Sequence, residues 1–185
     1  MKKILLTAIA LMAMSMAGNA QTSEDIQQSE KRCAELQKLV EGQPKACGAQ
    51  KVDKFGASIT EAAVLAIENS GKLADLYRRT VGETKDGVTD VEIKKPTVEE
   101  CVSLSTSIAG EGTMLTEAGK SLEDAGKELK ELTSQKSPKA IKQAKGATSI
   151  IAYGKDAMAI LSEETVAQGK AIKEIIETVK SGKNL

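Results

Sequence analysis

Glu111 is the side chain whose position most suggests chemistry, because it falls on a stripe of otherwise apolar residues. It is the only charged residue on the seam of a predicted long helix, and Gly110 and Gly112 flank it. A carboxylate inside a bundle needs hydrogen-bond partners or a raised pKa. Three polar residues of neighbouring predicted helices fall at a similar height: Asn69, Ser70 and Thr165. Two interpretations follow: the helix kinks at the glycines and Glu111 reaches solvent, or an internal polar layer binds a small molecule or an ion.

The chain has three cysteines, Cys33, Cys47 and Cys101. In an exported protein two of them are expected to pair. Only the turn between the first two predicted helices separates Cys33 from Cys47, and closing so short a loop contributes about 3 kcal/mol, so we predict that disulfide. Cys101 lies on a helix seam and is predicted to be a small buried hydrophobe. A reactive thiol near a helix N-terminus and an intermolecular bridge are the alternatives for Cys101.

No constellation of catalytic residues emerges from the sequence. Histidine is absent, which excludes His-based acid–base catalysis, Ser-His and Cys-His pairs, and His-ligated metals. The acidic pairs at 99–100 and 163–164 are predicted to be solvated, because adjacent helical residues point in different directions. We therefore predict no catalytic residue, no cofactor and no metal site, and expect that the protein is not an enzyme.

The N-terminus is typical of a cleavable secretory signal. Lys2 and Lys3 precede an apolar run over residues 4–16, which is too short to span a bilayer comfortably. Small residues follow, so cleavage is predicted between Ala20 and Gln21, leaving a single domain over 21–185. The protein is therefore expected in the bacterial periplasm, with a Gram-negative host preferred, or outside the cell.

The mature chain is predicted to be all-α. Apolar residues recur at spacings of three and four, and aromatic residues are only 2% of the chain, which favours aliphatic helix packing over sheets. Caps, glycines and prolines divide the chain into four expected helices over 23–41, 50–80, 98–134 and 138–181, joined in part by a long 82–96 connection. These helices predict an elongated antiparallel bundle with a short first helix and coiled-coil-like Gly/Ala-rich packing. Close backbone approach is the expected reason for glycines such as Gly112, Gly119 and Gly126, which recur every seven residues.

Charge and surface patterning favour protein partners. The formal net charge is zero, which argues against nucleic acid and against a polybasic membrane anchor. Long amphipathic helices leave membrane contact open, although the absence of Trp disfavours it. The leading hypothesis is a non-enzymatic, exported protein that binds a partner or self-associates through its helix faces. The alternatives are a membrane-interacting bundle and a small-molecule binder that uses the internal polar layer.

Overall fold

A computed structural model describes residues 22–81 and 94–182 as an all-α protein. Its four helices are α2 (Thr22–Glu41), α3 (Gln50–Val81), α4 (Val98–Ser134) and α5 (Pro138–Lys180). These bounds agree with the predicted ranges to within two residues. The predicted leader, its cleavage point at Ala20 and Gln21, and most of the 82–96 connection lie outside the described residues.

Local side-chain chemistry sets two of the helix starts. Thr97 and Glu100 form a capping box, in which the Glu100 N–H donates to Thr97 Oγ1 (3.2 Å) and the Thr97 N–H donates to Glu100 Oε2 (2.8 Å). Ser137 accepts from the Ala140 N–H (3.2 Å), and Pro138 stands in the first turn of α5. Only three residues separate α4 from α5, so the two longest helices form an antiparallel hairpin.

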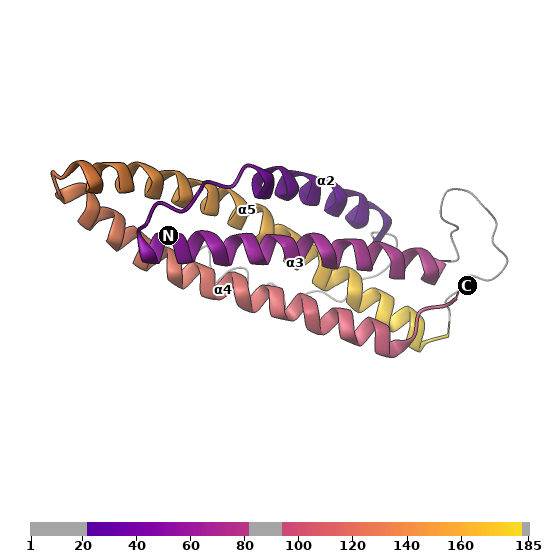
Figure 1. The fold of residues 1–185 in the computed structure, drawn as a ribbon. Helices are drawn as coiled ribbons and strands as arrows, with labels where there is room; N and C mark the ends of the chain where they lie inside the picture. The colour runs from indigo at the N-terminus through magenta and orange to yellow at the C-terminus, as the bar shows by residue number, and fades with distance from the viewer. Residues whose placement is uncertain (1–21, 82–93, 183–185) are drawn as a thin grey trace.

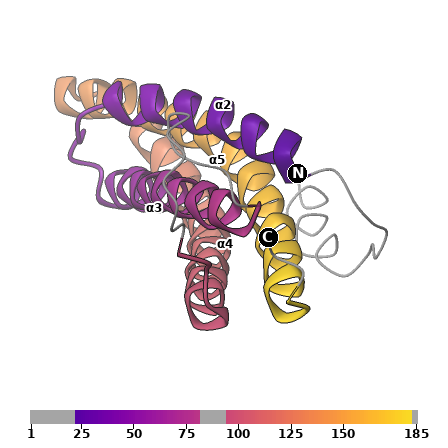
Figure 2. The same cartoon turned by 90° about the vertical axis from the view of Figure 1, so that its right-hand side faces the viewer.

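The helices are arranged around a central pair. α3 and α5 pack against each other, α4 packs against both from one side, and α2 packs against both from the other (Figures 1 and 2). The molecule is long because α4 and α5 have 37 and 43 residues, which corresponds to about 55–65 Å at 1.5 Å per residue. α2 covers only part of this length (Figure 1).

The buried apolar side chains form two separate clusters along the bundle axis. The larger core is built from residues of all four helices, among them Leu36 of α2 and Leu161 of α5. The smaller core, nearer the C-terminus of α5, is built from α3, α4 and α5 alone: Leu73, Leu76, Cys101, Leu104, Ile108, Ala171, Ile172 and Ile175. The residues between the two clusters are polar, and they form the site described below.

Glycines allow α3 and α5 to interlock in the larger core. A Cβ at Gly154 of α5 would overlap the Phe55 ring of α3, and a Cβ at Gly56 would lie 2.7 Å from Ile150 Cγ2. These two glycines therefore make room for side chains of the facing helix, whereas the expectation was close approach of the two backbones. Gly126, one of the regularly spaced glycines of α4, has no close neighbour, because a Cβ there would meet nothing within 4 Å.

The predicted Cys33–Cys47 disulfide is wrong in this structure, where all three cysteines are free. Cys33 lies against Glu164 of α5, whereas Cys47 lies against Gly146. These contacts are eighteen residues apart on α5, about 27 Å along the helix, and a disulfide needs Cα atoms within about 7 Å. The 42–49 segment extends along the bundle between α2 and α3, instead of folding back as the prediction required (Figure 1).

The contrast between these glycines gives a stability prediction. Gly154→Ala is expected to lower the free energy of unfolding by about 1–3 kcal/mol, because the new methyl group collides with the Phe55 ring. Gly126→Ala is expected to raise it by about 0.5–1 kcal/mol, because open space faces the new Cβ and Ala is the better helix former. Urea denaturation followed by helical circular dichroism measures both. Equal effects at the two positions would contradict this packing.

Candidate functional site: a buried polar layer beside a groove

A layer of polar side chains crosses the bundle between the two apolar cores. Its buried members come from all four helices, and several have no exposed surface. They are Ser29, Asn69, Ser70, Glu111, Glu164, Thr165 and Gln168, and Arg32 joins them from the edge. We call these eight residues the polar layer. Adjacent residues on a helix point about 100° apart. α3 and α5 therefore each contribute to both sides of the layer, with Asn69 and Thr165 on one side and Ser70, Glu164 and Gln168 on the other.

Glu111 organises the side of the polar layer that faces α4. Its Oε2 accepts from Asn69 Nδ2 (3.1 Å), and its Oε1 accepts from Thr165 Oγ1 (2.5 Å). Asn69 Oδ1 in turn accepts from Ser107 Oγ (2.8 Å) on α4. Glu111 is fully buried and α4 is continuous through Gly110 and Gly112, so the interpretation in which Glu111 reaches solvent is wrong. The carboxylate lies in an internal polar layer, and ligand binding by that layer stays a prediction.

The environment of Glu111 favours its neutral form. Burial, opposed by the hydrogen bonds from Thr165 and Asn69 and reinforced by the charge of Glu164, raises the pKa of Glu111 to about 7. The Thr165 hydroxyl has one proton but lies near two acceptors, Glu111 Oε1 and the Leu161 carbonyl (2.8 Å). When Glu111 is ionised, Thr165 donates to it. When Glu111 is protonated, it donates to Thr165, which then donates to the carbonyl.

Glu164 organises the side that faces α2. Its Oε2 accepts from Arg32 Nε (2.7 Å), while its Oε1 accepts from Ser29 Oγ and from Gln168 Nε2 (2.8 Å). Ser29 also pairs with Ser70 Oγ (2.7 Å), which must donate in that bond because the Ser29 proton points to Glu164. Glu164 is fully buried, and these charge-assisted bonds connect α2 to α5.

Two buried side-chain atoms on this side have no hydrogen-bond partner among the described residues, namely Arg32 Nη2 and Gln168 Oε1. Gln168 Nε2 is fully used, since it donates both to Glu164 and to the Ala66 carbonyl (2.8 Å). The Cys33 thiol also lies near Glu164 Oε1 (3.7 Å). Burial and the Glu164 charge raise the pKa of Cys33 to about 11, so its thiol stays protonated and unreactive at neutral pH.

The predicted polar residues divide between the two sides of the layer. Asn69 and Thr165 contact Glu111, whereas Ser70 turns toward Ser29 on the opposite side. The prediction of a solvated 163–164 pair is wrong for Glu164, which is fully buried. The sequence signal for it was Gln168, a polar residue on the α5 seam one turn after Glu164. Cys101 is buried in the smaller core, where burial and then the Glu100 charge raise its pKa.

An open groove lies beside the polar layer between α3 and α4. The volume of the groove is about 930 Å³. One of its lining residues is Ser107, the hydrogen-bond partner of Asn69. The other lining residues are Ile67, Glu68, Gly71, Lys72, Asp75, Leu76, Arg79, Glu99, Glu100, Ser103 and Leu104. We call this feature the α3–α4 groove.

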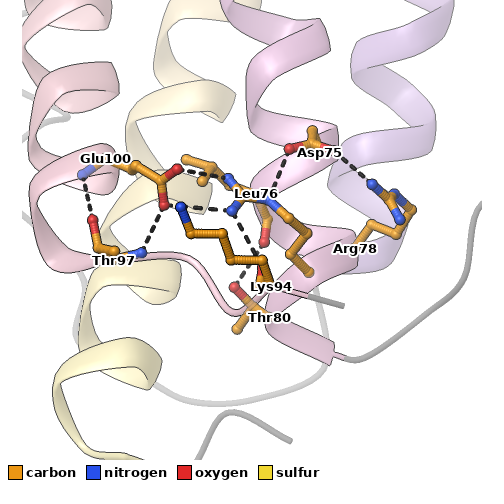
Figure 3. A network of polar contacts seen from close by, with 8 residues as sticks. Asp75, Leu76, Arg78, Thr80, Lys94, Thr97 and Glu100 are labelled. Atoms are coloured by element: carbon orange, nitrogen blue, oxygen red, sulfur yellow. Dashed lines mark hydrogen bonds and ion pairs between the residues drawn. The ribbon is translucent and has the colours of Figure 1, made fainter. Parts of the chain in front are cut away.

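Arg79 links α3 to α4 at one end of the α3–α4 groove. Its guanidinium pairs with Asp75 of α3 (2.9 Å) and with Glu100 of α4 (3.4 Å), and it donates to the Lys94 carbonyl (3.3 Å). Figure 3 shows this network around the capping box of α4. The Thr97 N–H and the nearby Arg79 charge lower the pKa of Glu100, which keeps that carboxylate ionised.

Comparison with known proteins adds no assignment: no family model, no curated protein and no solved structure matches this chain. Within residues 22–81 and 94–182, no helix combines the length and apolar character that crossing a membrane requires. In the same stretches, no three His, Cys, Asp or Glu side chains gather in a way that could hold a metal ion.

The raised pKa of Glu111 predicts a specific dependence of stability on pH. With a folded-state pKa of about 7 and an ordinary value of 4.5, the folded state keeps a proton that the unfolded chain has already lost. The stability from this group is fully present below pH 4.5 and is lost as the pH rises through 7. The loss amounts to roughly 3 kcal/mol. Glu111→Gln mimics the protonated form of Glu111, so this variant is expected not to lose stability as the pH rises.

Chemical denaturation of both proteins between pH 5 and 8 measures this effect. The stability of Glu111→Gln relative to the wild type is expected to grow as the pH rises from 5 to about 7 and to level off above that, where Glu111 is ionised in both the folded and the unfolded chain. Glu117→Gln, at an exposed position on the same helix, is the control and should run parallel to the wild type. A constant difference between Glu111→Gln and wild type across this range would show that the Glu111 carboxylate is not held in its neutral form.

Proposed function

We propose that this protein is a non-enzymatic binding protein that takes a basic segment of a partner protein in the α3–α4 groove. The observation that carries the proposal is the shape of this groove together with the charge on its rim. In keeping with the N-terminal sequence, we also propose that residues 1–20 are removed on export. The coiled-coil-like helices of the mature chain then meet the partner in the periplasm or outside the cell.

The groove has the shape of a site for a polypeptide segment. Its α3 wall extends from Ile67 to Arg79, about 18 Å along the helix, and it is open along the surface. Leu76 and Leu104 give it an apolar floor. A Cβ at Gly71 would meet nothing within 4 Å, so this glycine leaves room for side chains of the occupant. Amphipathic helices dock in apolar grooves of this kind.

The rim of the groove favours a positively charged occupant. Its charged groups are four carboxylates and two cations: Glu68, Asp75, Glu99, Glu100, Lys72 and Arg79. The lining residues therefore carry a net charge of −2, although the whole chain is neutral. Asp75 and Glu100 are already compensated, because Asp75 pairs with Arg78 and Arg79, and Glu100 pairs with Arg79 and lies near the charge of Lys94. Glu68 and Glu99 are the carboxylates that remain for a basic occupant. Complementary charge guides encounter and fixes the orientation of a bound segment.

The arrangement of the groove supports binding in preference to catalysis. Two hydroxyls line it, and the Ser107 hydroxyl donates to the Asn69 amide, which is no base. A nucleophilic serine needs an adjacent general base to remove its proton. The groove is also a better candidate than a continuous apolar face. Among the described residues, the exposed large hydrophobics are Val64, Val102 and Ile141, on three different helices.

Selection of peptides from a random twelve-residue display library tests the proposal. We expect selected peptides to be enriched in Lys, Arg and Leu-like residues. Gly71→Leu fills the groove and is expected to weaken their binding at least tenfold, without loss of helical structure. Gly126→Leu, which also faces open space but lies far from the groove on α4, is the matched control and should bind normally. Enrichment of acidic peptides, or binding that Gly71→Leu leaves unchanged, would refute the proposal.

A further inference from the structure

Ser107 stands at the junction of the α3–α4 groove and the polar layer. It is half-buried, it lines the groove, and its Oγ donates to Asn69 Oδ1. The Asn69 amide then donates from Nδ2 to Glu111 Oε2. Two hydrogen bonds of 2.8 and 3.1 Å therefore connect a wall of the groove to a fully buried carboxylate.

The direction of these hydrogen bonds determines whether an occupant of the groove favours the ionised or the neutral form of Glu111. Each donor in a chain of hydrogen bonds polarises the next, so a group that donates to Ser107 Oγ strengthens the bond from Asn69 to Glu111. Lysine and arginine side chains are donors without acceptors. A basic occupant of the groove therefore strengthens the hydrogen bond to the ionised carboxylate. Its positive charge also favours that form directly.

We propose that a basic segment bound in the α3–α4 groove donates a hydrogen bond to Ser107 and thereby causes Glu111 to release the proton that it shares with Thr165. The proton leaves the carboxyl group of Glu111 for solvent, and the Thr165 hydroxyl turns from the Leu161 carbonyl to the carboxylate. Binding and proton release are thus linked, and the segment binds more tightly as the pH rises. This inference rests on the proposed function, because it requires that the groove takes a basic occupant.

The charged groups around Glu111 do not supply this linkage by themselves. From α5, Glu164 faces it and opposes its ionisation. From α2, Arg32 is paired with Glu164, and the Cys33 thiol near Glu164 stays protonated. On α3, the neutral Asn69 is the residue that contacts it. The charges that line the groove, namely Glu68, Lys72, Asp75, Arg79, Glu99 and Glu100, are the rim groups that the occupant itself meets. Two further cations lie next to this rim, Arg78 beside Asp75 and Lys94 beside Glu100.

The hydrogen-bond relay can be tested without any ligand. Carbon-13 NMR titration follows the Glu111 carboxyl group, whose signal is assigned by its loss in Glu111→Gln. Ser107→Ala removes the donor to Asn69, so the apparent pKa of Glu111 is expected to rise by roughly 0.3 or more. Ser103→Ala removes a hydroxyl from the groove one turn earlier on α4 and is expected to leave it unchanged. If the two variants titrate alike, the relay does not exist.

The linkage is tested with the tightest basic peptide from the display selection. Calorimetry in two buffers of different ionisation enthalpy should detect release of up to roughly half a proton per peptide at pH 7. Affinity should rise roughly threefold or more between pH 6 and 8. In Glu111→Gln both effects should vanish, although all rim carboxylates remain. Peptide binding without these effects overturns the linkage but not the proposed function, whereas failure to select any basic peptide overturns both.

Discussion

Burying the carboxylate of Glu164 among four packed helices is the constraint on which the rest of the structure depends. An ion removed from water is costly unless opposite charge and hydrogen bonds surround it. Arg32, Ser29 and Gln168 meet that requirement, and two of the three belong to α2. The short first helix therefore has one position along the α3–α5 pair in which this charge is neutralised. A shift of α2 by one turn would leave the ion without its partner.

The polar layer that contains Glu164 also separates two parts of the bundle with different architecture. On one side, four helices share the larger core, where glycines of α3 and α5 make room for side chains of the facing helix. On the other side, three helices enclose the smaller core, and the α3–α4 groove opens there. A uniformly apolar seam would permit several registers. The polar layer disfavours other registers, because a shifted helix would separate Glu164 from Arg32, and it places Glu111 within two hydrogen bonds of the groove.

Features of the fold that depend on neighbouring residues in the sequence could be predicted, whereas features that depend on tertiary contacts could not. Caps such as Thr97 and Ser137 act within a few residues, so the helix bounds were accessible from the sequence. Glu111 was recognisable because one charge interrupts an apolar stripe. Glu164 was missed because α5 contacts three helices and buries a wider face than a single seam implies. The cysteine pairing failed because it depended on the path of the 42–49 segment, which tertiary contacts such as Gln143 to the Gly48 carbonyl determine.

The claim that the Glu164 charge fixes α2 in place can be tested by a double-mutant cycle on this ion pair. The wild type, Arg32→Met, Glu164→Gln and the double variant are compared by their free energies of unfolding. We predict a coupling energy of about 2–3 kcal/mol, with the double variant more stable than the single effects imply. Single effects that add to within about 0.5 kcal/mol would mean that the two side chains do not depend on each other, and would contradict the account.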